Sequence, residues 1–261
     1  MIKSLSVLKY APLAVVLMAV NVQAKTINKE YQVAEGGKLN IETDRGSIDV
    51  ESHNKDTVLI EVNIDGKDED KMEVVFNHSG DNVKIIGDME SSGFNFFNNN
   101  SLKVTYTIKV PQHYELDLNT SGGSIEISEI NGEIDAHTSG GSISLEHVEG
   151  DINVRTSGGS INVEEVSGTV VAHTSGGSIN AKLSKAPSGD SKFTTSGGSI
   201  KVYLAKDIRA DLYAKTSGGK VKSEFTVNGH IKKNSISGTL NGGGPELVFK
   251  TSGGSIRIKE I

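Results

Sequence analysis

A six-residue motif recurs through the second half of the chain and constrains the fold more than any other feature. Thr-Ser-Gly-Gly-Ser-Ile begins at Thr120, Thr138, Thr156, Thr174, Thr195 and Thr251, with a variant at Thr216. Successive starts differ by 18, 18, 18, 21, 21 and 35 residues, and Asn234–Gly244 reads as a degenerate copy inside the longest interval. A fixed period of about 20 residues is typical of stacked units that cannot bury an apolar face alone.

Within each unit, apolar and polar residues alternate with a period of two, which predicts β-strands. One strand follows each motif, and a second is expected at 134–136, 152–154 and 170–172. Glycine turns at Gly132, Gly150 and Gly168 separate the two strands, and the Ser-Gly-Gly corner separates the units. We expect the corner glycines, Gly158 among them, to supply positive φ angles that a side chain would strain.

Two topologies fit this pattern: an antiparallel meander of hairpins, and a β-solenoid in which equivalent residues stack about 4.8 Å apart. The solenoid is favoured because identical residues recur at one phase of every unit, so that threonine hydroxyls and β-branched side chains form columns. We therefore predict an all-β protein: a β-solenoid, a right-handed parallel β-helix by the usual crossover preference, with coils of 18–21 residues.

The segment 25–111 also alternates but lacks the regular repeat, although residues 43–48 resemble a worn copy of the motif. Because an open solenoid end invites pairing between molecules, we expect this segment to be an N-terminal β cap and 112–261 to form the glycine-cornered coils.

Residues 1–24 have the pattern of a cleavable signal peptide. Lys3 and Lys9 precede the apolar run 11–20, and the segment ends Val22-Gln23-Ala24, with small residues where a signal peptidase cleaves. The run is too short to span a bilayer, and no later stretch is apolar enough to do so. The sequence thus predicts an exported protein, periplasmic or extracellular and associated with the cell envelope, without a membrane span after cleavage.

Composition and charge narrow the classes of function. The chain has no cysteine and 5% aromatic residues, which excludes a disulfide framework, a thiol nucleophile and a lipid-bearing cysteine. Residues 25–119 carry 10 Lys+Arg against 18 Asp+Glu, 120–181 carry 1 against 9, and 182–261 carry 14 against 6. The basic end favours an anionic surface or acidic glycan, whereas the acidic remainder argues against nucleic acid. Charges that merely keep a sheet soluble are the plainer interpretation.

No residue pattern predicts a catalytic, metal or cofactor site. The motif serines recur in every unit, whereas an active site is singular. His137 and His173 share a phase two coils apart with Arg155 between them, which is too far for one metal ion. Thr194, Lys215 and Lys250 continue this phase, which predicts a solvent-facing basic stripe. Glu146 and Glu164 share a phase, but the segment lacks the aromatics of a sugar-processing groove. His147 lies in phase with Glu129 and Glu165, as expected for charge compensation.

The sequence offers one candidate binding segment, the loop 88–101. Phe94, Phe96 and Phe97 lie there among serine, glycine and asparagine. Exposed aromatics in a loop are typical of binding hot spots. The alternative is that these rings fold back over the end of the solenoid as an apolar plug.

An export signal, a strand-rich start, the Val110-Pro111 step into 116–119 and the repeated motif together resemble a family of adhesin-like bacterial proteins, β-strand-repeat domains of unknown function. The resemblance covers about residues 29–261, implies a β-solenoid with adhesion as its role, and supplies no catalytic residues. We therefore expect a non-enzymatic scaffold that binds an envelope protein or glycan. The alternatives are a polysaccharide-acting enzyme and a self-assembling structural protein of the envelope.

Overall fold

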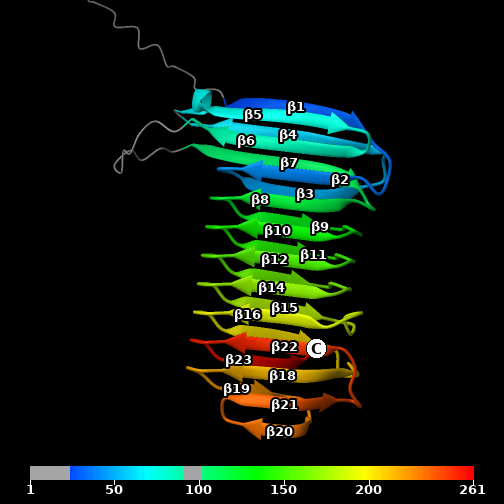
Figure 1. Cartoon of the computed structure of the whole chain (residues 1–261), viewed down its shortest axis with the longest axis vertical. Helices are drawn as coiled ribbons and strands as arrows, with labels where there is room; N and C mark the ends of the chain where they lie inside the picture. Colours follow the sequence, from blue (N-terminus) through cyan, green and yellow to red (C-terminus); the bar gives the residue numbers. More distant parts are fainter. Residues whose placement is uncertain (1–23, 67, 91–101) are drawn as a thin grey trace, which may run out of the picture.

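The computed structural model describes residues 24–66, 68–90 and 102–261, which form a long stack of strands in two facing sheets (Figure 1). Residues 1–23 of the predicted signal peptide lie outside the described residues, and so do Phe94, Phe96 and Phe97. A short 3₁₀ turn, Glu69–Lys71, is the one helical element in the described part of the chain.

Each sheet runs the length of the stack. Sheet A has the strand order β1 (Lys25–Gln32), β4 (Thr57–Asp65), β7 (Lys103–Pro111), β3 (Ser47–His53), β9 (Ile125–Ser128), β11 (Ile143–Glu146), β13 (Ile161–Glu164), β15 (Ile179–Leu183), β17 (Ile200–Leu204), β23 (Ile256–Glu260) and β19 (Val221–Ser223). Sheet B has the order β5 (Met72–Ser79), β6 (Asn82–Met89), β2 (Lys38–Thr43), β8 (Glu115–Thr120), β10 (Ile134–Thr138), β12 (Ile152–Thr156), β14 (Val170–Thr174), β16 (Ser191–Thr195), β22 (Glu246–Thr251), β18 (Ala210–Thr216), β21 (Ser235–Leu240) and β20 (Asn228–Lys232).

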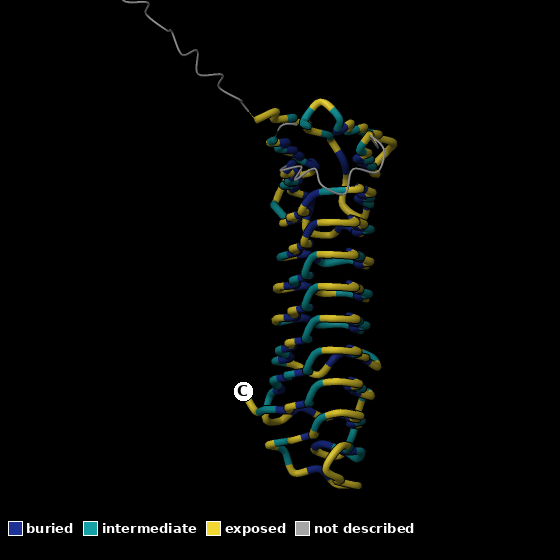
Figure 2. The backbone as a smooth tube through the Cα atoms, turned by 90° about the vertical axis from the view of Figure 1, so that its left-hand side faces the viewer, coloured by how far each residue is buried: buried dark blue, intermediate teal, exposed yellow. Residues whose placement is uncertain are grey.

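The strands of successive motifs pair in parallel and in register, which confirms the solenoid and excludes the meander. Ile125 lies opposite Ile143, and Ile143 opposite Ile161. The threonines that precede them stack in the same way, as Thr138 and Thr156 do. One coil thus consists of a sheet B strand, the Ser-Gly-Gly corner and a sheet A strand, and Figure 2 shows the coils as regular rungs.

The core lies between the two sheets and is built mainly from small aliphatic side chains. Inward positions of most strands carry Ile, Val, Leu or Ala, nearly all less than 4% exposed. Phe193 and Phe249 stack in the interior with ring centroids 5.3 Å apart. Because only one layer of side chains from each sheet fills the gap, β-branched residues nesting on identical neighbours suffice, which explains the low aromatic content.

The threonine and the second serine of the motif each make a hydrogen bond that recurs from coil to coil. The buried threonine donates its hydroxyl to the carbonyl of the second corner glycine in the adjacent coil, as Thr138 Oγ1 does to Gly123 O at 2.7 Å. The second serine accepts from the backbone N–H of its counterpart in the next coil, as Ser142 Oγ does from Ser160 N at 3.1 Å. The threonines thus bond to the backbone and do not form a hydroxyl ladder with each other.

The corner glycines are required for a different reason from the one expected. Neither Gly158 nor Gly159 has a positive φ, so the prediction of a strained left-handed corner is wrong. A Cβ on Gly159 would instead lie 2.0 Å from Gly141 O of the adjacent coil, whereas one on Gly158 would lie 3.2 Å from Gly140 O. Positive φ occurs at the opposite turns, with 140° at Gly150 and 125° at Gly168. The second corner glycine is therefore needed for close backbone approach.

The last coil does not stack in chain order. The strands β22 and β23 insert between the coil of β16 and β17 and the coil of β18 and β19 (Figure 1). The inward column therefore runs Ile200, Ile256, Val221, and not in sequence order as expected. After β17, the chain first forms the coil of β18 and β19 one position further along the stack. The last coil, of β22 and β23, then occupies the position between them.

The segment Asn234–Gly244 is not a degenerate coil. Its strand β21 pairs antiparallel with β18 and with β20, which extends sheet B by a hairpin beyond the last coil. The hairpin accounts for the long interval between the motifs at Thr216 and Thr251, and it covers the outer edge of β18.

The N-terminal end contains a second crossing of chain order. The coil of β2 and β3 lies between the coil of β6 and β7 and the coil of β8 and β9. The worn motif at 43–48 stacks in the motif columns, since Thr43 lies opposite Thr120 and Ile48 opposite Ile125. Beyond these coils, β1, β4 and β5 run antiparallel to their neighbours, and Tyr31 contacts His78 between β1 and β5.

Candidate binding surfaces

Outward side chains form columns along both sheets, with the composition that the repeat predicts. His137, Arg155 and His173 lie in register on sheet B. The arginine therefore separates the two histidines, as expected from their phase. Among the described residues, no group of three or more His, Cys, Asp or Glu side chains is arranged to hold a metal ion.

The acidic column of sheet A is neutralised where it ends. Glu146 and Glu164 lie in register, and Lys182 continues the column. Lys182 Nζ lies 3.2 Å from Glu164 and 2.7 Å from Glu165. Hydrogen bonds from Lys182 and then Ser184 lower the pKa of Glu165, and the bond to Glu165 raises the pKa of Lys182. This column is a charge-compensated surface ladder.

The equivalent turn in each of three successive coils, beside this ladder, has one residue in the left-handed region. Glu129, His147 and Glu165 have φ angles of 61°, 51° and 51°. His147 Nδ1 lies 4.0 Å from Glu129 and 3.6 Å from Glu146. The histidine thus lies among carboxylates on the surface, in agreement with charge compensation, and none of these side chains is buried.

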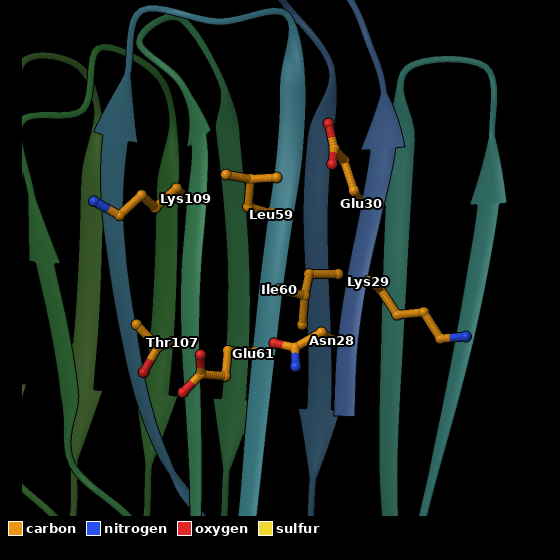
Figure 3. Close-up of a pocket in the computed structure, with 8 residues that line it drawn as sticks. All are labelled: Asn28, Lys29, Glu30, Leu59, Ile60, Glu61, Thr107 and Lys109. Carbon is orange, nitrogen blue, oxygen red and sulfur yellow. The ribbon is translucent and has the colours of Figure 1, made fainter. Parts of the chain in front are cut away.

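Three hollows on the described surface are lined by mixed or acidic charge. The first, about 450 Å³, lies over β1, β4 and β7, and its charged lining residues are Glu30, Glu61, Lys29 and Lys109 (Figure 3). Figure 3 shows these side chains spread along the strands without converging on one point. The second hollow lies at the N-terminal end, and its acidic lining residues are Asp70, Glu73, Asp88 and Glu90. The third lies beside the glycine turns, and its acidic lining residues are Glu149 and Asp151.

A fourth hollow, of about 300 Å³, is basic, and we call it the basic hollow. It lies on the outer face of sheet B beside the corner and contains no carboxylate. Its residues are His173, Thr194, Thr195, Ser196, Lys215, Ser217, Lys250, Thr251 and Ser252. Lys215 and Lys250 are directly opposite each other on neighbouring strands. Sequence reasoning found a basic stripe through Thr194, Lys215 and Lys250, but it missed their true order, because the inserted coil places Lys250 in the middle.

The described residues include no helix long and apolar enough to cross a membrane. Comparison of the sequence with curated proteins gives no significant match. The profile of the Toastrack family, DUF4097, matches residues 37–155 and again residues 147–259. This chain belongs to the Toastrack family. Each of the two matches spans one of the ends at which the chain order is crossed, together with part of the regular stack between them.

Several solved structures are similar to this Toastrack protein. A proposed cell adhesion protein of Clostridium sporogenes aligns with a TM-score of 0.43 and 16% identity, over 92% of this chain and 100% of its own. A proposed adhesin of Bacteroides fragilis aligns with a TM-score of 0.41 and 16% identity, over 92% and 99%. A proposed lipid binding protein of Parabacteroides distasonis aligns with a TM-score of 0.40 and 18% identity, over 90% and 96%.

Proposed function

We propose that this Toastrack protein is a non-catalytic binding scaffold of the bacterial cell envelope. The observation that carries the proposal is the division of the repeat into inward and outward positions. The inward residues and the corner hydroxyls are committed to the stack, while the outward residues form exposed polar columns at the strand spacing. A surface of this kind suits many weak contacts with an extended partner, whose strength adds through multivalency.

The arrangement of polar groups supports binding more than turnover. Glycoside hydrolysis needs two carboxyl groups with different environments beside a sugar-binding groove. The stacked pair Glu146 and Glu164 has both side chains more than half exposed, and Lys182 neutralises one end of the column. The motif serines recur in every coil, where they either accept backbone hydrogen bonds or are exposed to solvent, so none of them is singled out as a nucleophile.

The test is a titration of the protein from residue 25 onward with fractionated envelope polysaccharide and with envelope protein extract. We expect saturable binding to one fraction, measured by biolayer interferometry, with no new reducing ends released. A deletion of one coil, residues 139–156, is the matched variant, because it shortens the columns without changing either end. Release of reducing ends above a heat-denatured blank would favour the enzyme alternative, and filaments at high concentration would favour self-assembly.

The aromatic loop is a second part of this proposal and rests on sequence alone. We propose that Phe94, Phe96 and Phe97 contribute to partner binding. Changing all three to serine is expected to weaken capture of the envelope partner. A variant in which Asn98, Asn99 and Asn100 become serine leaves the rings intact and is the control. Equal capture by wild type and the phenylalanine variant would show that these rings do not bind.

A further inference from the structure

The basic hollow lies where three coils of the basic end meet. Its walls come from the coil of β16, the inserted coil of β22 and the coil of β18, and His173 of β14 completes the lining. Residues 182–261, to which these coils belong, carry 14 Lys+Arg against 6 Asp+Glu. On the outer face of sheet A, the same coils carry Lys201, Arg257 and Lys222 in register. The hollow therefore lies in the part of the chain with a net positive charge, which attracts anions from solution.

Lys215 and Lys250 form a like-charged pair that the fold does not neutralise. Directly opposed like charges destabilise a sheet. Among the described residues, neither lysine has a carboxylate within 4.0 Å, in contrast to Lys182, which holds both Glu164 and Glu165. The Nζ of Lys250 lies 5.0 Å from the ring centroid of Tyr213, which helps to hold the cation in place. An anion bound between the two lysines would relieve this repulsion.

Hydroxyl groups surround the two cations. Ser196, Ser252 and Ser217 occupy the first serine position of three stacked motifs, and all three are exposed. No side-chain hydrogen bond joins them to the rest of the described chain, whereas the second motif serines Ser199 and Ser255 accept backbone N–H groups. Thr194 Oγ1, in the same hollow, lies 2.9 Å from His173 Nδ1. The three serines are thus available to a ligand.

The inserted coil creates this arrangement. If the coils stacked in chain order, Lys215 would lie beside Thr194, and Lys250 would be at the outer edge of the stack. Because β22 inserts between β16 and β18, Lys250 lies between Thr194 and Lys215 in the middle of the hollow. The volume of about 300 Å³ is at the lower end of the range for small-molecule sites and suits one or two sugar units.

We propose that the basic hollow binds the anionic unit of an envelope glycan. The carboxylate or phosphate lies between Lys215 and Lys250, and the sugar hydroxyls bond to the corner serines and to Thr194. This inference rests on the proposed scaffold function and names its ligand class and one of its sites. Carboxylate and phosphate are alternative sources of the same negative charge, so the experiment uses a probe for each.

The experiment measures binding of trigalacturonate, mannose 6-phosphate and neutral maltotriose by calorimetry and by shifts of backbone amide resonances. We expect one or both anionic probes to bind and to shift the amides of Thr194, Ser196, Ser217 and Ser252, and we expect maltotriose not to bind. The variant Lys215→Gln with Lys250→Gln should weaken binding by about tenfold or more, since two charge-assisted contacts are lost. The matched control, Lys201→Gln with Arg257→Gln, removes two charges from the same coils on the opposite face and should change binding less than about twofold.

Four results would overturn the inference. Equal weakening in both double variants would mean diffuse attraction to the charged end, as would binding confined to phosphatidylglycerol vesicles. Amide shifts elsewhere, with the sheet B hollow unaffected, would place the ligand at another site.

If the Lys215→Gln and Lys250→Gln variant still binds the envelope fraction with wild-type affinity, the assignment of the site to the basic hollow is wrong while the scaffold function stands. If wild type binds a probe at the hollow but no envelope fraction, the scaffold function is wrong. Circular dichroism and melting curves establish that each variant is folded.

Discussion

Thr251 donates its hydroxyl to the carbonyl oxygen of Gly198 at 2.7 Å, although 53 residues separate them along the chain. In the regular part of the stack, the same bond joins Thr138 to Gly123 across 15 residues. The inserted coil therefore makes the standard corner contact with a neighbour that is distant in sequence. Contacts between coils depend on position in the stack and not on chain order.

The second corner glycine should be much less tolerant of a side chain than the first. In Gly159→Ala the new Cβ would lie 2.0 Å from Gly141 O, so the coils must separate. We expect a loss of about 3 kcal/mol in the free energy of unfolding, measured by urea denaturation. Gly158→Ala is the control, with its nearest contact at 3.2 Å, and should cost less than about 1 kcal/mol. Equal effects would contradict the close-approach argument.

The motif threonine should be sensitive to loss of its hydroxyl and not to loss of its methyl group. Thr156→Val keeps the shape but leaves Gly141 O without the donor that lies 2.7 Å away. We expect a destabilisation of about 1–2 kcal/mol. Thr156→Ser retains the donor and should cost less than half as much. Melting temperatures of the two variants provide the comparison, and a more stable valine variant would be the contrary result.

One whole coil should be removable. Deleting residues 139–156 joins Thr138 to Ser157, which removes β11 and β12 and leaves every remaining column in register. Since each coil contacts only its neighbours, the shortened protein should fold with unchanged strand content and a slightly lower melting temperature. Deleting residues 139–155 instead removes one residue fewer. It should prevent cooperative folding, because a shift of one residue turns inward side chains outward. Circular dichroism distinguishes the two.

The N-terminal end should lose stability in alkali. Burial raises the pKa of Tyr106 and of Tyr114 to about 12. Their hydroxyls contact Thr43 Oγ1, at 3.0 Å, and Asp81 O. Because the folded-state pKa lies above the unfolded value of about 10, the stability is present below pH 10 and is lost as pH rises towards 12. The loss at pH 11 should be about 1 kcal/mol per tyrosine. Tyr106→Phe should flatten the fall in melting temperature between pH 10 and 12, whereas Tyr203→Phe, a half-buried residue on the outer face, should not.

Much of the binding surface was predictable from the repeat, but its geometry was not. The phase of His137, Arg155 and His173 correctly indicated a surface column with the arginine in the middle. The basic stripe was also visible in the sequence. The hollow itself was not, because it requires Lys250 to lie between Thr194 and Lys215. The sequence predicted a local requirement at the corner glycines, a positive φ angle. The actual requirement is close approach to the adjacent coil, which the dihedral preferences of a single coil do not reveal.

The sequence by itself determined the period, the two strands of each coil and the side chains that point inward. These features follow from alternation with a period of two and from identical residues at one phase, both of which are local. Only the tertiary structure decided which coil lies beside which. Every coil presents nearly the same Thr, Gly and Ile to its neighbours, so the corner bonds form equally well in chain order or with a coil inserted. The order is decided instead by connections between distant segments, such as the hairpin of β20 and β21, whose antiparallel pairing with β18 no repeat pattern encodes.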